Sequence, residues 1–366
     1  MYENELNALH AKDRFRERKL YGGYADFASN DYLGFAKDKK QLKKAYKTLL
    51  KQDYFAPRAS QLVNGYAPIH AKFEKLLCET NGFESAMLFG SGFAANLSLV
   101  STLPRRRDLV LMDDEYHASG VMGSESTQGK VEFFAHNDAD ALEAKLQNIS
   151  GYERVFIFVE GVYSMIGDIL ERRIFDIADK YNAVLVVDEA HSVGVLGDRL
   201  LGVFDYYKIK PKPNHIKMGT LGKALGSFGA YVLASMEVIS FLENRAKPFV
   251  YATALSLFDT ALAYHNYKKM IKNSHLLKVR LNERRFRFCS VTKCDFETQV
   301  AMIEDEQNQT KKLHNILLEN KILTGFIRPP TVSRPAIRAV IGLSADELEF
   351  EKFLAILSGS NIKRAF

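Results

Sequence analysis

Uninterrupted apolar runs of strand length are the feature that most constrains the fold of this chain. Residues 155–159 read Val-Phe-Ile-Phe-Val, and residues 184–187 read Val-Leu-Val-Val. A strand that is apolar at every position has to be covered on both faces, which is typical of a parallel sheet between two layers of helices. Such runs alternate with helix-period segments up to residue 255. This alternation predicts a doubly wound, mostly parallel α/β domain.

The pattern also places the individual elements of that domain. The expected strands are residues 86–89, 109–112, 131–134, 155–160, 183–188, 215–218 and 230–234. Helices are expected between them, for example at residues 92–103 and 170–181. Ligands of doubly wound sheets bind beyond the carboxyl ends of the strands. Residues directly after a strand are therefore the first candidates for a functional site.

The sequence pattern changes after residue 255. A long helical stretch comes first, and shorter strand-like and helical segments follow it. The expected elements are a helix at 257–280, strands at 288–291 and 298–303, a helix at 310–320, a strand at 336–343 and a helix at 345–357. These segments predict a second, smaller α/β domain.

The first residues resemble neither part. The basic clusters at residues 14–19 and 37–47 are expected to be solvated faces of helices. The segment Phe27-Ala-Ser-Asn-Asp-Tyr-Leu-Gly34 lies between them. We therefore expect an N-terminal arm at residues 1–40, a large domain at 41–255 and a small C-terminal domain at 256–366.

Composition and charge argue against several classes of protein. The net charge of +6 can attract an anionic substrate or an acidic carrier, but no basic stripe alternates with aromatic residues as in nucleic-acid binding. No apolar run approaches the ~18 residues of a membrane span, and the first residues lack the pattern of a secretory signal. The cysteines, Cys78, Cys289 and Cys294, are odd in number and lack CxxC spacing. We expect no disulfide framework, no metal site and a cytoplasmic location.

Polar residues follow several of the expected strands. Ser91 and Gly92 open a helix, where free N–H groups and the helix dipole can bind phosphate; the alternative is a plain turn. His117 could stack on a planar ring, or it is a structural histidine. Ser164 is a site residue, or it is a turn residue or cap. Because these positions meet at one edge of a doubly wound sheet, their coincidence favours a shared site.

An aspartate and a lysine carry the most specific chemistry. Asp188 ends an apolar strand, so it should be buried and its charge needs a partner; a helix N-cap is the alternative. Lys223 lies in the loop Gly219-Thr-Leu-Gly-Lys-Ala-Leu-Gly226, whose glycines let a ligand approach the backbone. The alternative is a surface lysine. The loop lacks the GxxxxGK[ST] order of a nucleotide-binding phosphate loop.

This pair predicts pyridoxal 5′-phosphate as the cofactor. The ring nitrogen of that cofactor needs a carboxylate to stay protonated, and its aldehyde needs an amine that forms a Schiff base. Asp188 and Lys223 suit these two tasks. A lysine near a cationic ring or in a dry pocket has a lowered pKa and becomes a nucleophile. His191, three residues after the aspartate, could hydrogen-bond to the phenolic oxygen of the cofactor.

These residues belong to a longer series of motifs, in which the chain resembles the α-oxoamine synthases, fold type I pyridoxal-phosphate enzymes. The motifs are Ser29-Asn-Asp-Tyr-Leu-Gly34, Asn64-Gly-Tyr66 with His70 and Glu74, Ser91-Gly-Phe-Ala-Ala-Asn96, His117-Ala-Ser119, Glu160-Gly-Val-Tyr-Ser-Met165 with Gly167-Asp168, Asp188-Glu-Ala-His191, Thr220-Leu-Gly-Lys223 and Pro329-Pro-Thr-Val332. They follow the family's order through residues 26–343. The resemblance implies a large cofactor-binding domain and a smaller C-terminal domain.

The resemblance also implies a role for each matching residue. Lys223 would carry the cofactor and exchange the proton at the substrate's Cα, Asp188 would pair with the ring nitrogen, and His117 would stack on the ring. Further cofactor contacts would come from Gly92, Phe93, Ser164, His191, Thr220 and, toward the partner subunit of a dimer, Thr253. The substrates would be held by Arg16, Asn30, Thr331 and Arg338. Arg338 matches the carboxylate-binding arginine if the loop at 333–335 is two residues shorter than usual.

Within the family, the chain is most similar to the branch that condenses L-alanine with a pimeloyl thioester in biotin synthesis. The acyl group would be carried on coenzyme A or on acyl carrier protein. Tyr66 after Gly65, the motif at 328–332 and the compact chain favour this branch. The alternatives are a sister synthase that takes glycine or serine with another acyl-CoA, and a non-catalytic pyridoxal-phosphate scaffold. The resemblance further implies a homodimer with shared active sites.

Overall fold

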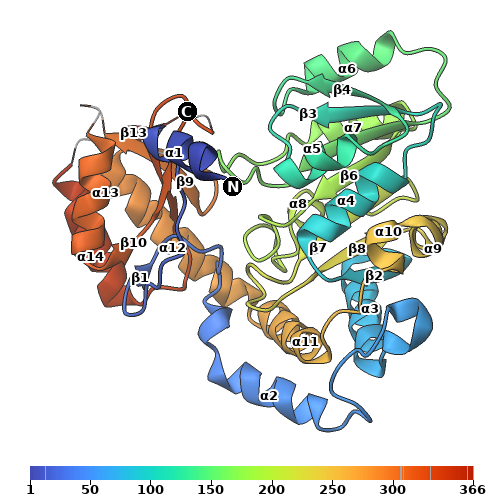
Figure 1. The fold of residues 1–366 in the computed structure, drawn as a ribbon, viewed down its shortest axis with the longest axis horizontal. Helices are drawn as coiled ribbons and strands as arrows, with labels where there is room; N and C mark the ends of the chain where they lie inside the picture. Colours follow the sequence, from blue (N-terminus) through green and yellow to red (C-terminus); the bar gives the residue numbers. More distant parts are fainter. Residues whose placement is uncertain (13, 306, 308, 330, 361, 366) are drawn as a thin grey trace.

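The computed structural model describes residues 1–12, 14–305, 307, 309–329, 331–360 and 362–365. Its largest feature is a seven-stranded sheet in the order β2-β8-β7-β6-β5-β3-β4 (Figure 1). The strands are β2 Ser85–Phe89, β3 Leu109–Asp113, β4 Lys130–Phe134, β5 Val155–Glu160, β6 Val184–Asp188, β7 His215–Thr220 and β8 Ala230–Ala234. All neighbours are parallel except β8, which runs antiparallel to β7 and β2. The expected doubly wound, mostly parallel α/β fold is confirmed.

Both faces of this sheet are buried, as the apolar runs predict. Ile157 and Leu185 belong to a core on one face, together with Ile174 of α7. Their neighbours Phe158 and Val186 point to the other face and pack in a separate core. The covering helices are α3 Pro68–Asn81, α4 Gly92–Thr102, α5 Ala118–Ser124, α6 Ala139–Gln147, α7 Arg173–Lys180, α8 Val203–Tyr206, α9 Met236–Arg245 and α10 Lys247–Val250. Alternate residues of each strand therefore supply two cores.

A second, smaller sheet forms the other lobe of the molecule in Figure 1. Its four strands lie in the order β11-β12-β9-β13, and all neighbours are antiparallel. The strands are β9 Val300–Asp305, β11 Gly325–Ile327, β12 Ala336–Val340 and β13 Ile362–Arg364. The helices of this part are α13 Thr310–Glu319, α14 Glu347–Ser358 and the second half of α12 Ser274–Thr292, whose Phe288 lies in the core of the small sheet. α11 Leu257–Lys272 packs against α3 instead, and its buried residues belong to the core of the large sheet. The expected domain limits at residues 40 and 255 stay predictions.

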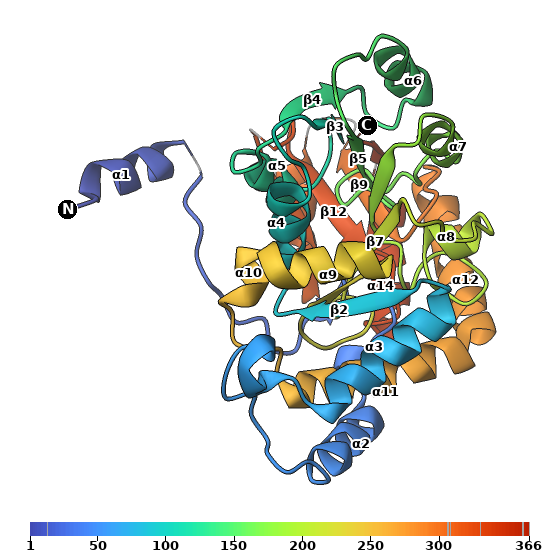
Figure 2. The same cartoon turned by 90° about the vertical axis from the view of Figure 1, so that its right-hand side faces the viewer.

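The N-terminal region carries α1 Glu3–Ala11, which projects from the body at the end of an extended segment in Figure 2. Further along, the strand β1 Ala25–Asp26 pairs in parallel with β10 Ile322–Leu323. The short helix η1 Phe35–Lys37 leads into α2 Lys39–Leu49, and η2 Gln61–Gly65 follows. β1 therefore fastens the N-terminal region to the smaller lobe. Among the described residues, no helix is both long enough and apolar enough to cross a membrane.

Two sequence expectations were wrong. Residues 288–291 lie inside α12 and form no strand. Leu277, Leu281, Arg284 and Phe288 of α12 are buried at helical spacing, and Arg284 interrupts the apolar pattern. Arg284 is tolerated there because its Nη1 donates to the carbonyl oxygens of Gly342 and Ala345, both at 2.8 Å.

The second error concerns the basic cluster at residues 14–19, which forms no helix. Arg14 and Arg18 would be like charges one turn apart, which destabilises a helix. None of these side chains is buried, so no packing compensates. The other basic cluster, at residues 37–47, does contribute an exposed helical face, that of α2.

Candidate active site

Asp188 lies at the carboxyl end of β6 and is almost fully buried, at 4% exposure. Its Oδ2 accepts a hydrogen bond from Nδ2 of Asn96 at 2.6 Å, and its Oδ1 accepts one from the backbone N–H of Ala190 at 2.9 Å. Asn96 is held in turn by the hydroxyl groups of Tyr116 and Ser119, at 3.0 and 3.1 Å. The carboxylate is therefore fixed by a buried network, as a buried charge requires.

Lys223 follows β7, and its Nζ points to the same edge of the sheet. Nζ lies 2.6 Å from Nε2 of His191, whose Nδ1 lies 2.7 Å from the hydroxyl of Tyr32. Burial lowers the pKa of Lys223 to about 8, although the charges of Asp188 and Glu160 oppose this shift. Burial and the charge of Lys223 hold the pKa of His191 well below its ordinary value. A neutral His191 can accept from Lys223, and the amine is deprotonated more easily than that of an ordinary lysine.

His117 stands at the start of α5; the residue is exposed as a whole, but its ring is partly buried. Its Nδ1 accepts from the backbone N–H of Ser119 at 3.2 Å and lies 2.7 Å from the hydroxyl of Ser119. Burial lowers the pKa of His117, while the charge of Asp188 raises it and that of Lys223 lowers it. His117, Asp188 and Lys223 therefore act on one another electrostatically. The imidazole of His117 offers a flat face on which a planar ring could stack.

The N-terminus of α4 lies beside the end of β7. Ser91 caps the helix, because its Oγ accepts from the N–H of Ala94 at 3.1 Å. Gly92 and Phe93 begin the first turn, where N–H groups have no partner within the helix. A Cβ on Gly92 would lie 3.9 Å from Oγ1 of Thr220. Gly92, Phe93 and Thr220 thus form a cradle suited to a phosphate group.

Arg338 of β12 reaches from the small sheet toward the same edge and is 8% exposed. Its Nε donates to the carbonyl oxygen of Ser164 at 3.0 Å, and its Nη2 donates to Oδ1 of Asn30 at 3.1 Å. The positive charge of Arg338 lowers the pKa of both Lys223 and His191. Three predicted residues from distant parts of the sequence, Asn30, Ser164 and Arg338, are therefore neighbours within range of Lys223.

Arg16 and Thr331, predicted to hold the acyl substrate, line one pocket of about 410 Å³. Its walls combine arginines with apolar side chains. The other lining residues are Leu9, Arg14, Met165, Phe326, Ile327, Arg328 and Pro329. Pro330 of the predicted motif lies outside the described residues. Met165 directly follows Ser164, so the pocket borders the loop that Arg338 contacts.

Thr253 is not among the residues brought together at Lys223. It is exposed in the segment after α10, next to Ala254, whose N–H donates to the carbonyl oxygen of Ala59 at 3.0 Å. Its predicted role across a dimer interface stays a prediction. The same holds for the individual roles of the other predicted residues, although the geometry groups them.

Sequence reasoning missed Asn96, Tyr32 and Glu160. All three stand in the motifs quoted above, but no role was inferred for them. Glu160 ends β5 beside Asp188 and is 2% exposed. Its Oε2 accepts from the N–H of Ser164 at 3.0 Å, and its Oε1 has no hydrogen-bond partner among the described residues. Burial and the charge of Asp188 hold the pKa of Glu160 well above its ordinary value. The available signal was that Glu160 ends an apolar strand, as Asp188 does, so both acids could be expected at the same edge of the sheet.

The sequence and the fold of this chain are similar to those of known proteins. The family model of class I and II aminotransferases matches residues 23–350. An 8-amino-7-oxononanoate synthase of Helicobacter pylori is 42% identical over 100% of this chain and 99% of its own length. A crystal structure of 8-amino-7-oxononanoate synthase from Francisella tularensis is 26% identical, with a TM-score of 0.74 over 92% of this chain and 97% of that one.

The fold is also shared with a more distant enzyme. A serine palmitoyltransferase variant from S. paucimobilis, solved with a bound aldimine of pyridoxal phosphate and myriocin, superposes with a TM-score of 0.86. The alignment covers 98% of this chain and 96% of that one at 22% identity. This likeness concerns the fold alone.

Proposed function

We propose a function from one premise: this chain belongs to the aminotransferase class I and II family and is an enzyme whose cofactor is pyridoxal 5′-phosphate. The reaction we propose is that of 8-amino-7-oxononanoate synthase. L-alanine condenses with a pimeloyl thioester, and carbon dioxide and the free thiol are released, as one step of biotin synthesis. The observation that carries the proposal is the full-length match to a synthase of this name.

The side chains at the edge of the sheet fit the cofactor. A buried carboxylate, Asp188, an amine with a lowered pKa, Lys223, and the N-terminus of α4 are the three groups that its ring nitrogen, aldehyde and phosphate would require. His117 would lie on the ring, and Ser164, His191 and Thr220 would add polar contacts. When bound, the cofactor supplies an aldehyde that bonds to amines and a ring that takes up electrons from the substrate's Cα.

Lys223 is the proposed proton carrier at Cα. Its pKa of about 8 places the amine close to the point at which it can both take up and return a proton near neutral pH. His191 supports this role, because its neutral ring can accept from Nζ while Tyr32 holds the other ring nitrogen. Asp188 is proposed to hold a positive charge on the ring nitrogen through an ion pair.

Arg338 is the proposed anchor for the carboxylate of L-alanine. The guanidinium group can bind a carboxylate with two parallel hydrogen bonds. Asn30 and the carbonyl oxygen of Ser164, from two distant parts of the sequence, fix its orientation. The amino acid would thereby be oriented with its Cα toward Lys223.

The pocket of Arg16 and Thr331 supports a site for the acyl donor. Its apolar residues, among them Phe326 and Ile327, suit an aliphatic chain, and its arginines suit an anionic group. Pimeloyl thioesters offer both. The donor is proposed to ride on coenzyme A or on acyl carrier protein.

The proposal includes a homodimer with shared sites, in which Thr253 contacts the cofactor phosphate of the partner subunit. The exposure of Thr253 in a single chain supports this placement. We also propose a cytoplasmic location, which agrees with the three free cysteines.

The test is thiol release by the purified, cofactor-loaded protein. L-alanine, glycine and L-serine are each combined with pimeloyl-, acetyl- and succinyl-CoA. Each amino acid is also combined with pimeloyl-acyl carrier protein. The proposal expects release with alanine and a pimeloyl donor. Release with another pair only would assign a sister activity, and silence in every combination would favour the non-catalytic scaffold.

A further inference from the structure

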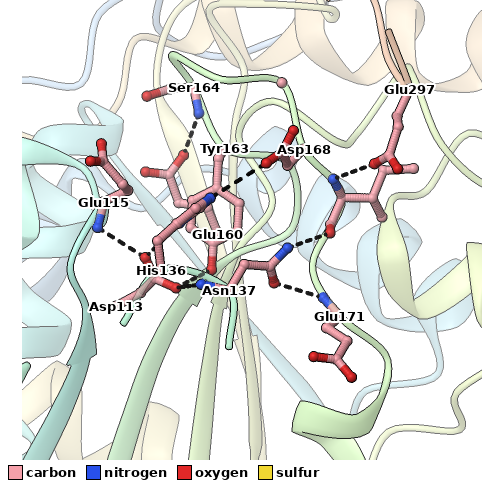
Figure 3. Close-up of polar contacts among 12 residues, drawn as sticks. Asp113, Glu115, His136, Asn137, Glu160, Tyr163, Ser164, Asp168, Glu171 and Glu297 are labelled. Atoms are coloured by element: carbon pink, nitrogen blue, oxygen red, sulfur yellow. Dashed lines mark hydrogen bonds and ion pairs between the residues drawn. The ribbon is translucent and has the colours of Figure 1, made fainter. Parts of the chain in front are cut away.

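The loop at residues 161–169, which carries Ser164, is held from both lobes of the molecule. From the large sheet, the hydroxyl of Tyr163 donates to Oδ2 of Asp113 at 2.7 Å, and Nδ2 of Asn137 donates to the carbonyl oxygen of Ile169 at 2.9 Å. Figure 3 shows these side chains converging on the loop from the strand ends. The loop is therefore tied down on the side of the cofactor-binding domain.

The small lobe holds the same loop from the opposite side. Oγ1 of Thr298 donates to the carbonyl oxygen of Gly167 at 2.8 Å, and the N–H of Ile169 donates to Oε2 of Glu297 at 3.2 Å. Gly167 has a φ of +84°, and a Cβ there would lie 2.5 Å from the carbonyl oxygen of Val300. Any side chain at position 167 would clash with the small lobe, so this close approach requires glycine.

An ionic chain crosses this junction with alternating signs. Nδ1 of His136 lies 3.0 Å from Oδ1 of Asp113, and its Nε2 lies 3.6 Å from Oδ2 of Asp168. Asp168 in turn accepts from Nη2 of Arg364, in β13, at 2.7 Å. His136 stands two residues after the end of β4, and Figure 3 shows its ring between Asp113, Tyr163 and Asp168. The rings of His136 and Tyr163 have centroids 4.3 Å apart. Because Arg364 belongs to β13, this series of charges runs from the large sheet through the loop to the small sheet.

The charge state of His136 fits this arrangement. Burial alone would lower the pKa of His136, but Asp113 and Asp168 outweigh it and raise the pKa to about 9. Asp168 has a lowered pKa, because of His136 first and Arg364 second. Near neutral pH, anionic and cationic side chains therefore follow one another along this ionic chain, and each charged group has a neighbour of opposite charge.

We propose that His136 is a positioning residue for the amino-acid subsite, because it holds the loop that presents the carbonyl oxygen of Ser164 to Arg338. The inference rests on the proposed function, in which Arg338 binds the substrate carboxylate. His136 touches neither substrate nor cofactor. It acts through Asp168 and Tyr163, which lie on either side of Ser164 in the loop and so fix the position of Ser164. Its loss should therefore weaken the binding of alanine and not that of the acyl donor.

The test compares His136→Gln and Arg364→Gln with the control Arg172→Gln in cofactor-loaded protein. Arg172 lines one cavity of about 760 Å³ together with His136, Asp168 and Arg364, but its Nη1 donates to Oδ2 of Asp176, one helical turn away, at 2.9 Å. Hydrogen–deuterium exchange of peptides covering 161–169 should rise in the first two variants and stay unchanged in the control. The KM for L-alanine should rise about tenfold, whereas the KM for pimeloyl-CoA should not change.

The pH profile separates positioning from general stability. His136 is charged below about pH 9, so the advantage of the wild type over His136→Gln in alanine affinity should be full at pH 7.5 and shrink as the pH passes 9. The charged or titratable groups that contact His136 or line the same cavity are Asp113, Tyr163, Asp168, Glu171, Arg172, Tyr206, Tyr207, Glu297 and Arg364. Burial raises the pKa of Tyr207 to about 12, and Tyr206 is present in both proteins that are compared. Carboxylates and guanidinium groups ordinarily titrate far from this range, and burial raises the pKa of Tyr163 well above its ordinary value.

Unchanged exchange in the loop together with unchanged alanine affinity in both variants would overturn the proposal, even if the melting temperature fell. Should His136→Gln fail to fold, Arg364→Gln decides, because it leaves the contact between His136 and Asp113 in place. The exchange measurement needs no turnover. It therefore tests the loop even if the wild type releases no thiol from alanine and pimeloyl-CoA, an outcome that would count against the proposed function alone.

Discussion

The side-chain amine of Lys223 lies 2.6 Å from Nε2 of His191. His191 is buried and has a pKa well below its ordinary value, so its neutral ring can accept a hydrogen bond that the amine donates. The contact links Lys223 to Tyr32, whose hydroxyl lies 2.7 Å from the other ring nitrogen. The amine thus has a fixed direction before any ligand arrives.

Replacing Lys223 by alanine should abolish thiol release with every substrate pair. The other buried amine of this region, that of Lys217 in β7, cannot replace it, because it donates to Asn81 and to the carbonyl oxygen of Leu201. In the wild type, borohydride reduction should leave the cofactor attached after denaturation, and in Lys223→Ala it should not. Lys43→Ala, on the exposed face of α2, is the control. Normal activity of Lys223→Ala would refute the assignment.

The uptake of pyridoxal phosphate by cofactor-free protein should depend on pH through Lys223. A protonated amine does not attack an aldehyde, so uptake should accelerate as the pH rises through about 8, the lowered pKa of this lysine. For an ordinary lysine the rise would centre near ~10.4. Stopped-flow absorbance between pH 6 and 10.5 measures the midpoint, and a midpoint above 10 would contradict a buried, shifted amine.

Asp188→Asn should retain the cofactor but lose turnover. The amide oxygen can still accept from the N–H of Ala190, so the loop after β6 should persist, but the negative charge beside the ring nitrogen is gone. We expect kcat to fall by about 10²–10³-fold. Cofactor content by absorbance and kcat by thiol release are measured together, with the surface variant Asp140→Asn as control. A kcat within twofold of wild type would rule out the ion pair.

Arg338→Lys should weaken the use of alanine more than that of the acyl donor. A lysine cannot bind a carboxylate with two parallel bonds, nor reach both Ser164 and Asn30 as the guanidinium group does. The KM for L-alanine should rise by about 10–100-fold, the equivalent of one lost charge-assisted hydrogen bond. Arg280→Lys, exposed on α12, serves as control. An equal rise in both KM values would point to a general distortion instead.

Gly226→Ala should destabilise the protein, whereas Gly222→Ala in the same loop should not. Gly226 has a φ of +53°, and an added Cβ would lie 2.5 Å from the backbone nitrogen of Ala36. At Gly222 the nearest atom would be 3.6 Å away. We expect a loss of about 1–3 kcal/mol for the first variant, measured by denaturant unfolding. Equal stability of the two variants would show that the loop can shift away from residue 36.

Much of the large domain could be predicted because its strands are buried on both faces. Strands such as β5 and β6 carry no polar residue until the end, so the pattern located both the strand and the candidate site residue after it. Asp188 and Lys223 could be paired from sequence because few functions require a buried carboxylate and an amine at neighbouring strand ends.

The rest depended on contacts that have no local signature. Arg284 is buried in α12 because two distant carbonyl groups accept from it, and these lie nearly 60 residues further along the chain. The direction of β8, the support of Asp188 by Asn96 and the chain through His136 depend on tertiary pairing of the same kind. Periodicity describes one element at a time, so it cannot reveal which polar side chains will meet.

The late position of β12 in the sequence has a consequence for biosynthesis. Chains fold from the N-terminus as they are made, so Asp188 and Lys223 emerge from the ribosome long before Arg338, and Arg364 comes later still. A chain that stops after β8 would carry Asp188 and Lys223, which are proposed to hold the cofactor, but would lack Arg338, which is proposed to bind the amino acid. On this proposal, selectivity for the amino acid is acquired only when the second half of the chain has been made.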